Sequence, residues 1–548
     1  MLLTYGTMQC DVLQPCTAAE GLRALKVNMD GVLAAQRGGQ VLELGDVIPG
    51  GGELAPITLK EEEGRRVYER SLRFVMLLAV RRLHPGQRVR IEYSVGRGVL
   101  VQLPGMTLTA AQVAALETEM RRITADNLPF IRKVWKLEDA KRYFADEGQT
   151  DKVGLLQLRP FQYFTMYGCG GMWEYFYGAM VPSTGYVPVF ALIPHAGGFV
   201  MQLPAPSAPD YPAPYVDSPK HLAVFAQSAA WCSILQVENA ADLARLMHKG
   251  GMRTFIRVNE ALHDKAIAAI AESIVQRGRR VVLIAGPSSS GKTTFAGRLD
   301  VQLRVLGYHP VKISLDNYYR NRDTLPRQED GSLDLEDIHA LDLPLLQQQV
   351  RQLLAGETVE VPRFSFVTGK REEKGVSVAL APGEMVLLEG IHGLNPLLSE
   401  GIPEEYIHRV FVSALTCLNL DDHNRIRTTD VRLLRRIVRD HQFRGTSAEA
   451  TLRMWQSVRQ GEDRWIFPFQ EQADSMFNTA LHYELPILKC YAYDLISEIP
   501  DTSECYLLAR RLLKTLHYIP APPEELLDEI PPTSLLREFI GGSTFDED

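Results

Sequence analysis

The apolar positions in the second half of the chain follow an alternation of strands and helices. Five apolar residues, Val281–Ala285, predict a short buried strand, and the amphipathic segment 295–306 predicts a helix after it. Two further apolar runs, at 310–316 and 385–391, predict strands that each end in a carboxylate. Strands that alternate with helices indicate a parallel sheet. The C-terminal part is therefore predicted to be an α/β domain, with a mainly parallel sheet flanked by helices.

The first half of the chain has a different pattern. Short apolar runs separated by Gly-rich turns in residues 1–60 indicate a small mixed domain, and further elements follow it. Helices are predicted at 64–83 and 109–127, and a strand pair at 89–93 and 99–103 is predicted between them. The segment 203–219 contains six prolines and predicts a linker, followed by helical periodicity over 221–276. This half is therefore predicted to be α+β.

Composition narrows the setting of the protein. The chain has 548 residues, so several domains are expected. The formal net charge of -8 argues against a bulk nucleic-acid binder. The sequence lacks an apolar run of about 18 residues and a basic region before the first apolar residues, so neither a membrane span nor a signal peptide is predicted. Seven scattered cysteines without paired CxxC elements indicate neither zinc nor a disulfide framework, and a cytoplasmic protein is expected.

The strand at Val281–Ala285 runs directly into a phosphate-binding motif. Residues 286–293 match G-x-x-x-x-G-K-[ST], in which glycines let backbone N–H groups turn toward phosphate oxygens. Lys292 is expected to reach the outer phosphates of a nucleoside triphosphate, and the Thr293 hydroxyl to bind Mg²⁺. The predicted ATP-binding residues of the loop are Gly286, Pro287, Ser288, Ser289, Ser290, Gly291, Lys292, Thr293 and Thr294.

Asp316 and Glu389 end the two strands predicted downstream of this loop. Ligands of open α/β sheets bind outside the carboxyl ends of the strands, so both carboxylates are expected beside the triphosphate. Mg²⁺ is the cation that suits such a site, because it binds one or two carboxylates together with phosphates. Thr293, Asp316 and Glu389 are therefore the predicted Mg²⁺ site, although either acid alone would also suit a helix cap.

A run of arginines lies near residue 436. On a helix, Arg432, Arg435, Arg436 and Arg439 form one stripe, and Arg444 lies just beyond it. A solvated face is the usual interpretation of such a run. Arginine also binds phosphate through its planar fork, and phosphoryl transfer needs positive charge around the transferred group. A phosphate-binding arginine lid is the favoured interpretation.

Four segments resemble the uridine kinase/phosphoribulokinase family: GPSSSGKTTF, ISLDNYY, VLLEGIHGLN and DVRLLRRIVRDHQFRG. The resemblance covers less than half of the chain, from about 280 to 500. It implies that Asp316 is the catalytic aspartate, with Lys292 and Arg436 assisting, and that Arg439 and Arg444 bind ATP. It further implies a substrate side made of Tyr319, Glu336, Phe364, Phe366 and Arg436.

Two departures from uridine kinases concern the substrate side. Leu335-Glu336 stands where uridine kinases have a Phe-Asp pair that contacts the ribose, and Gly369 stands where they have a histidine against the base. Phe364 and Phe366 align with base-stacking aromatics, and core packing is an equal alternative for them. These departures weaken the expectation of uridine as the substrate.

The N-terminal half resembles the TGS and second additional domains of threonyl-tRNA synthetases, on the segment from RSLRFVMLLAV to DAKRYF. A His-x-x-x-His pair of that family's editing module aligns with Arg70 and Phe74, neither of which replaces an imidazole as a ligand or base. A scaffold or gating role is therefore favoured over deacylation. The predicted domains are a TGS-like domain (1–62) and a second-additional-domain-like region (63–204). A Pro-rich linker with helices (205–250) and a P-loop kinase domain (251–548) are predicted to follow them.

These observations predict an ATP- and Mg²⁺-dependent kinase that phosphorylates the 5′-hydroxyl of a nucleoside, with uridine as one candidate. A first alternative is the same transfer to a phosphosugar or another alcohol. A second is an ATP-switched RNA-binding regulator, which the net charge and the altered histidine pair disfavour. The oligomeric state is not predicted.

Overall fold

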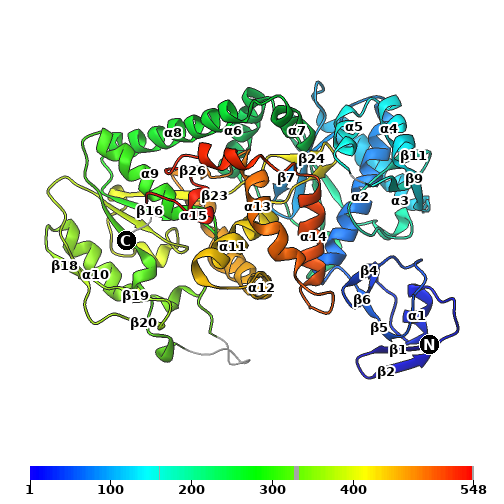
Figure 1. The fold of residues 1–548 in the computed structure, drawn as a ribbon, viewed down its shortest axis with the longest axis horizontal. Coiled ribbons are helices and arrows are strands. Elements are labelled where there is room, and N and C mark those ends of the chain that lie inside the picture. Colours follow the sequence, from blue (N-terminus) through cyan, green and yellow to red (C-terminus); the bar gives the residue numbers. More distant parts are fainter. Residues whose placement is uncertain (160, 326–332, 546–548) are drawn as a thin grey trace.

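A five-stranded parallel sheet forms the centre of the C-terminal part (Figure 1). The computed structural model describes residues 1–159, 161–325 and 333–545. The strand order is β17-β22-β16-β23-β26, and every neighbouring pair is parallel. The strands are β16 (Val281–Ala285), β17 (Val311–Ser314), β22 (Val386–Glu389), β23 (Ile407–Ser413) and β26 (Ser475–Asn478). The predicted α/β fold with a parallel sheet is confirmed.

Both faces of this sheet are covered, which explains why β16 is apolar at every position. Val282 and Ile284 pack in one core together with Phe295, whereas Val281 and Leu283 pack in another. The helices of this part are α8 (Met252–Gln276), α9 (Lys292–Val305), α10 (Leu343–Leu354), α11 (Thr428–Arg444), α12 (Ala448–Trp465), α13 (Glu484–Ser497), α14 (Tyr506–His517) and the short α15 (Arg537–Ile540). The sheet thus holds the loops at its carboxyl edge in fixed positions.

The N-terminal half is α+β, as its pattern predicts. It begins with two three-stranded sheets, β2-β1-β5 and β4-β3-β6, beside α1 (Ala18–Ala24). A four-stranded sheet, β12-β13-β8-β7, and a three-stranded sheet, β11-β10-β9, follow. The strands of the larger sheet are β7 (Arg90–Val95), β8 (Gly98–Gln102), β12 (Ala191–His195) and β13 (Gly198–Gln202), and the long helices are α2 (Glu62–Leu83) and α3 (Ala110–Ala125).

The remaining strands of this half are β1 (Leu2–Tyr5), β2 (Met8–Asp11), β3 (Ala34–Arg37), β4 (Gln40–Leu42), β5 (Gly52–Glu53), β6 (Ala55–Ile57), β9 (Ile131–Lys136), β10 (Tyr163–Cys169) and β11 (Met172–Glu174). The two short helices beside the smaller sheet are α4 (Leu137–Asp146) and α5 (Thr150–Gln157). Both predicted helices and the predicted strand pair are confirmed. Thr109 begins α3 with a capping box to Gln112, which explains its sharp start.

The predicted linker at 203–219 contains a hairpin. Strands β14 (Pro204–Ala205) and β15 (Ala208–Pro212) pair with each other and form a separate two-stranded sheet, where prolines are tolerated because few ladder hydrogen bonds are needed. The helical stretch after it is three helices rather than one, namely α6 (Pro219–Leu235), α7 (Ala240–His248) and α8. Gln236 ends α6 in a left-handed conformation, a local break that periodicity does not reveal.

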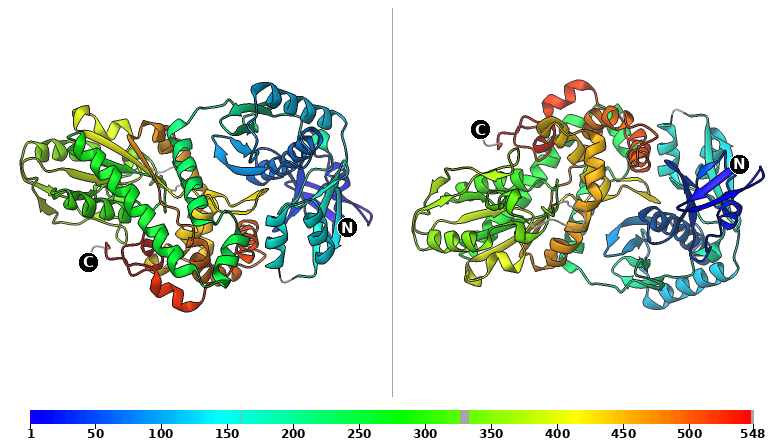
Figure 2. Two further views of the ribbon diagram at one scale, coloured as in Figure 1. Left: turned by 90° about the horizontal axis from the view of Figure 1, so that it is seen from above. Right: turned by 90° about the horizontal axis from the view of Figure 1, so that it is seen from below.

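A hairpin of the C-terminal part reaches into the N-terminal half (Figure 2). It consists of β24 (Asn419–Asp421) and β25 (Asn424–Arg425) and immediately precedes α11. The Ile91 amide donates to the Asp422 carbonyl at 2.8 Å, and Arg88 Nη2 donates to Asp422 Oδ1 at 2.9 Å. The two halves are therefore joined directly at the start of the arginine-rich helix. Within the described ranges, no helix is long and apolar enough to cross a lipid bilayer.

Candidate active site

The phosphate-binding motif forms a strand, loop and helix as its sequence predicts. The loop leaves β16 at Gly286, where a Cβ would collide with the Val412 carbonyl of the neighbouring strand. It enters α9 at Gly291, which has φ +84 and caps the helix without a side-chain hydrogen bond. The first N–H groups of a helix have no intrahelical partner and carry its positive end. This geometry leaves an anion-binding site at the start of α9.

Two serines of the loop are buried without a hydrogen-bond partner. Ser289 Oγ and Ser290 Oγ have none among the described residues, and their residues are 3% and 0% exposed. Buried hydroxyls in folded proteins are nearly always paired, because an unpaired one loses its hydrogen bonds to water. The lack of hydrogen-bond partners for these two hydroxyls fits a loop that receives such partners from a bound nucleotide.

The arginine stripe divides into structural and site residues, which corrects the prediction that all of it forms a lid. Arg432 is 1% exposed, forms an ion pair with buried Glu462 of α12, and donates from Nε to the Ser288 carbonyl at 3.0 Å. Glu462 also accepts from the Ser288 amide at 3.0 Å. Arg435 is fully buried and donates from Nε to Glu484 at 2.7 Å. These two arginines hold the loop and α13 in place and do not face an open phosphate site.

The other three arginines converge beside the loop. Arg436 Nη1 donates to Ser288 Oγ at 2.8 Å and lies 3.2 Å from Asp440. Arg439 and Arg444 lie 2.9 and 3.4 Å from the same buried carboxylate. Three guanidinium groups thus share one acid, which leaves an excess of positive charge at the loop. The lid prediction therefore now concerns only these three arginines of the stripe.

Lys292, Asp316 and Glu389 come together at the carboxyl edge of the sheet. Burial raises the pKa of Asp316, while the nearby Lys292 opposes this effect. Burial and the Asp316 carboxylate raise the pKa of Glu389 to about 7, and Ser314 donates a hydrogen bond to Glu389 at 2.8 Å. Burial lowers the pKa of Lys292 against the pull of neighbouring carboxylates, Glu389 first among them. The site therefore holds two closely spaced carboxyl groups, whose negative charge Lys292, Arg439 and Arg444 compensate only in part.

The chemistry of these groups fits Mg²⁺. The Asp316 carboxylate disfavours ionisation of Glu389, an effect that a divalent cation would reverse. Thr293 is exposed in the first turn of α9 and adds a hydroxyl. Described residues contain no group of three or more His, Cys, Asp or Glu suited to a metal ion. Mg²⁺ does not need such a cage, since it keeps several waters and uses substrate phosphates as ligands.

Three aromatic rings form a cluster around Tyr319, which lies three residues after Asp316 in the chain. Tyr319 lies 5.6 Å from Phe364 and 5.8 Å from Phe366 between ring centroids, and the two phenylalanines lie 5.3 Å apart. Tyr319 is 6% exposed and donates from its hydroxyl to the Leu335 carbonyl, whereas Phe366 is 47% exposed. The cluster therefore has a buried base and an open edge. Gly369 has φ +68 in the turn after these phenylalanines, so a histidine there would be strained.

His392 is a site residue that sequence reasoning missed. It is 1% exposed, and neither ring nitrogen has a hydrogen-bond partner in the described structure. Burial lowers its pKa to about 4, with smaller effects from Asp337 and Lys292, so the imidazole is neutral and offers one donor and one acceptor. The feature of the sequence that could have identified His392 is its position three residues after Glu389. Glu336, which was predicted, also has an unpartnered buried Oε2.

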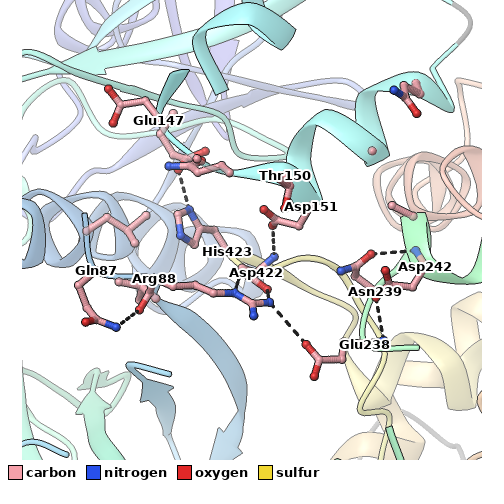
Figure 3. Close-up of a pocket in the computed structure, with 18 of the residues that line it drawn as sticks. Gln87, Arg88, Glu147, Thr150, Asp151, Glu238, Asn239, Asp242, Asp422 and His423 are labelled. Atoms are coloured by element: carbon pink, nitrogen blue, oxygen red, sulfur yellow. Dashed lines mark hydrogen bonds and ion pairs between the residues drawn. The ribbon is translucent and has the colours of Figure 1, made fainter. Parts of the chain in front are cut away.

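A separate cavity of about 920 Å³ lies between the two halves (Figure 3). Arg88 pairs there with Asp422, and Asp151 accepts from the Asp422 amide at 2.8 Å. Arg70 and Phe74 lie elsewhere in the N-terminal half: Arg70 donates from Nε to the Ala179 carbonyl at 3.0 Å, and Phe74 is fully buried in the core. Both positions of the altered histidine pair therefore serve the structure of that half.

A parallel sheet, a phosphate-binding loop and two strand-end carboxylates define a P-loop phosphotransferase. The model of the phosphoribulokinase/uridine kinase family matches residues 281–484. The chain is 32% identical over 202 residues to a uridine kinase from Lactobacillus johnsonii, covering 36% of this chain and 87% of that protein. A uridine kinase from Macrococcus caseolyticus is 30% identical over 195 residues, which is 35% of this chain and 85% of that protein. The chain belongs to the phosphoribulokinase/uridine kinase family and is an ATP-dependent kinase with an alcohol acceptor.

A different part of the chain resembles threonine–tRNA ligases. A threonine–tRNA ligase from Oleidesulfovibrio alaskensis is 34% identical over 170 residues, which is 31% of this chain and 26% of that protein. The chain thus spans about a quarter of the length of this relative. The match confirms the resemblance of the N-terminal half to threonine–tRNA ligases, and it covers only a fragment of that ligase.

Proposed function

We propose that the protein phosphorylates the 5′-hydroxyl of a nucleoside, with ATP as donor and Mg²⁺ as cofactor. The observation that carries the proposal is the position of Asp316, which is near Lys292 of the phosphate-binding loop and next to the aromatic cluster in the chain. A hydroxyl held between donor and aromatic rings would meet a carboxylate able to take its proton. Uridine is one candidate acceptor, in keeping with the names of the relatives.

Each group has a defined part in the transfer. The acceptor oxygen forms a bond to the γ-phosphorus as the bond to the bridging oxygen of ADP breaks, and the hydroxyl proton passes to Asp316. The raised pKa of Asp316 makes it a stronger base than an ordinary aspartate. Lys292, Arg436, Arg439 and Arg444 stabilise the charge on the phosphoryl oxygens. Thr293, Asp316 and Glu389 would hold Mg²⁺, which supplies charge neutralisation and orientation of the phosphates.

Glu336 and His392 on the acceptor side suit the hydroxyl groups of a neutral polar molecule. Burial and the nearby Glu462 raise the pKa of Glu336 to about 7, and His392 is neutral. Neither supplies a positive charge for a second phosphate group. Sugar hydroxyls would supply hydrogen-bond partners for Glu336 Oε2 and the ring nitrogens of His392, which have none among the described residues. A planar base would pack against the edge of Phe364 and Phe366.

A panel of acceptors tests this proposal. The purified protein is incubated with ATP and Mg²⁺ and with nucleosides, phosphosugars or simple alcohols, and ADP release and product mass are measured. We expect a nucleoside to give the highest kcat/KM and a 5′-monophosphate product. Phosphorylation of phosphosugars alone would contradict the acceptor, and ATP consumption with none of them would contradict the function.

Glu336 is expected to make acceptor binding dependent on pH. Its carboxyl group accepts hydrogen bonds from sugar hydroxyls with both oxygens only when it is ionised, and its pKa lies at about 7. The dissociation constant of the acceptor, measured by calorimetry without ATP, should therefore fall by about tenfold between pH 6 and pH 8. Glu336→Gln should bind weakly at both pH values, and exposed Glu360→Gln should behave as the wild type. A pH dependence that persists in Glu336→Gln would contradict the assignment.

A further inference from the structure

The C-terminal segment 531–545 packs against the phosphate-binding loop and α9. Leu535, Leu536 and Phe539 are fully buried, and the guanidinium of Arg435 lies 5.0 Å from the centre of the Phe539 ring. The Phe545 ring lies so close to α9 that a Cβ on Gly297 would approach it to 2.6 Å. The segment is therefore a fixed part of the domain core. The family match ends at residue 484, so this segment lies outside it.

Glu538 of this segment touches the anion-binding end of α9. Its Oε2 accepts a hydrogen bond from the Thr294 amide at 3.1 Å. That amide belongs to the first turn of the helix, whose N–H groups have no partner within the helix. Leu535 of the same segment lies 3.3 Å from the position that a Cβ on Gly291 would occupy. A carboxylate thus occupies a place that the motif otherwise offers to phosphate oxygens.

Glu538 also affects the charges of the site. Its carboxylate is one of the groups that favour protonated Lys292, and it adds to the negative charge that disfavours ionised Glu389. These influences reach across the loop, so Glu538 is a neighbour of the reacting groups as well as of α9. The buried, unpartnered Ser289 and Ser290 hydroxyls lie in the same loop and mark it as a ligand site independently of Glu538.

We propose that Glu538 is a residue of the nucleotide site, where its carboxylate holds the place of a phosphate group and must be displaced when ATP binds. This inference rests on the proposed function of the loop as the ATP site. The segment itself stays docked, because its leucines and Phe539 are buried, and only the half-buried Glu538 side chain has to rotate. The C-terminal segment then sets the affinity for the donor and disfavours binding of a triphosphate in the resting state.

The electrostatic consequence has a clear sign. The carboxylate is stabilised by the positive end of α9 while the site is empty. When ATP enters, the same charge repels the incoming phosphates at short range, where the effective dielectric constant is low. Removing the charge while keeping the shape of the side chain should therefore strengthen ATP binding.

The test is the affinity of Glu538→Gln for ATP, measured by calorimetry with Mg²⁺ and without acceptor. We expect the dissociation constant to fall by about tenfold or more relative to the wild type, given the repulsion that is removed. Glu538→Ala also removes the charge and should shift the constant in the same direction. Glu525→Gln, an exposed position of the same C-terminal region, is the matched control and should leave it unchanged.

The outcomes separate this inference from the proposed function. Wild-type ATP binding together with unchanged or weaker binding by both Glu538 variants would overturn the role of Glu538 alone. Failure of the wild type to bind ATP would overturn the proposed function, and this inference with it. Thermal unfolding of each variant shows whether the domain remains folded, and Glu538→Ala supplies the answer if Glu538→Gln does not fold.

Discussion

Asp316→Asn is expected to lower kcat by about 10²- to 10⁴-fold, the range typical of a lost general base. The amide has nearly the same shape as the carboxylate but cannot take the proton of the acceptor hydroxyl. ATP affinity measured without Mg²⁺ should change little, because the loop, Lys292 and the arginines proposed to bind the phosphates remain. The measurements are kcat with the best acceptor and, separately, ATP binding by calorimetry.

Asp323→Asn is the matched control for this variant. Asp323 is an exposed acid in the next short helix, and it pairs with Lys370 at 3.0 Å rather than with a site residue. It should keep wild-type kcat. If Asp316→Asn instead lost ATP affinity and turnover to the same extent, Asp316 would be a nucleotide-binding residue and the base would have to be sought elsewhere.

Arg432→Met is expected to reduce the free energy of unfolding by about 3–5 kcal/mol, as is usual when one partner of a buried ion pair is removed. Glu462 would be left as a buried charge without its main partner, since Arg459 contacts it from a more exposed position. The Ser288 carbonyl would also lose its hydrogen bond from Arg432. Urea denaturation measures the loss of stability.

Arg436→Met is the comparison that separates the two kinds of arginine on α11. Arg436 is half-buried and contacts the loop through Ser288 Oγ, so its loss should lower turnover at a small cost in stability. The double variant Arg432→Met with Glu462→Gln should regain part of the stability, because no unpaired buried charge remains. If Arg432→Met instead had normal stability but a large loss of ATP affinity, Arg432 would belong to the phosphate-binding arginines.

The sequence alone determined the class of the protein and much of its fold. Val281–Ala285 is apolar at every position because both faces of the strand are covered, and Gly286 and Gly291 are required by a close approach and a left-handed turn. An apolar run and two glycines at fixed spacing record these requirements in the sequence, although a group that imposes one of them, the Val412 carbonyl beside Gly286, lies far along the chain. The same holds for the two carboxylates: Glu389 is the last residue of β22, and Asp316 lies two residues after β17 ends at Ser314.

Only the tertiary structure decided which arginines belong to the site. Helical periodicity groups Arg432, Arg435 and Arg436 on neighbouring faces of one helix, but it does not show what lies opposite each face. Glu462 and Glu484, which pair with the first two, belong to other helices. The charge of a side chain is local information, whereas its partner depends on how distant segments pack.

Glu538 and His392 show the same limit. Glu538 is 244 residues from the amide that it contacts, and nothing in its neighbourhood along the chain marks it as a site residue. His392 lies within a recognised motif, yet its buried and unpartnered state follows from the packing around it. The sequence therefore determined the donor side of the site, where a local motif binds phosphate. The packing of segments far apart in the chain decided the buried, unpartnered state of His392 and the contact of the C-terminal segment with the loop.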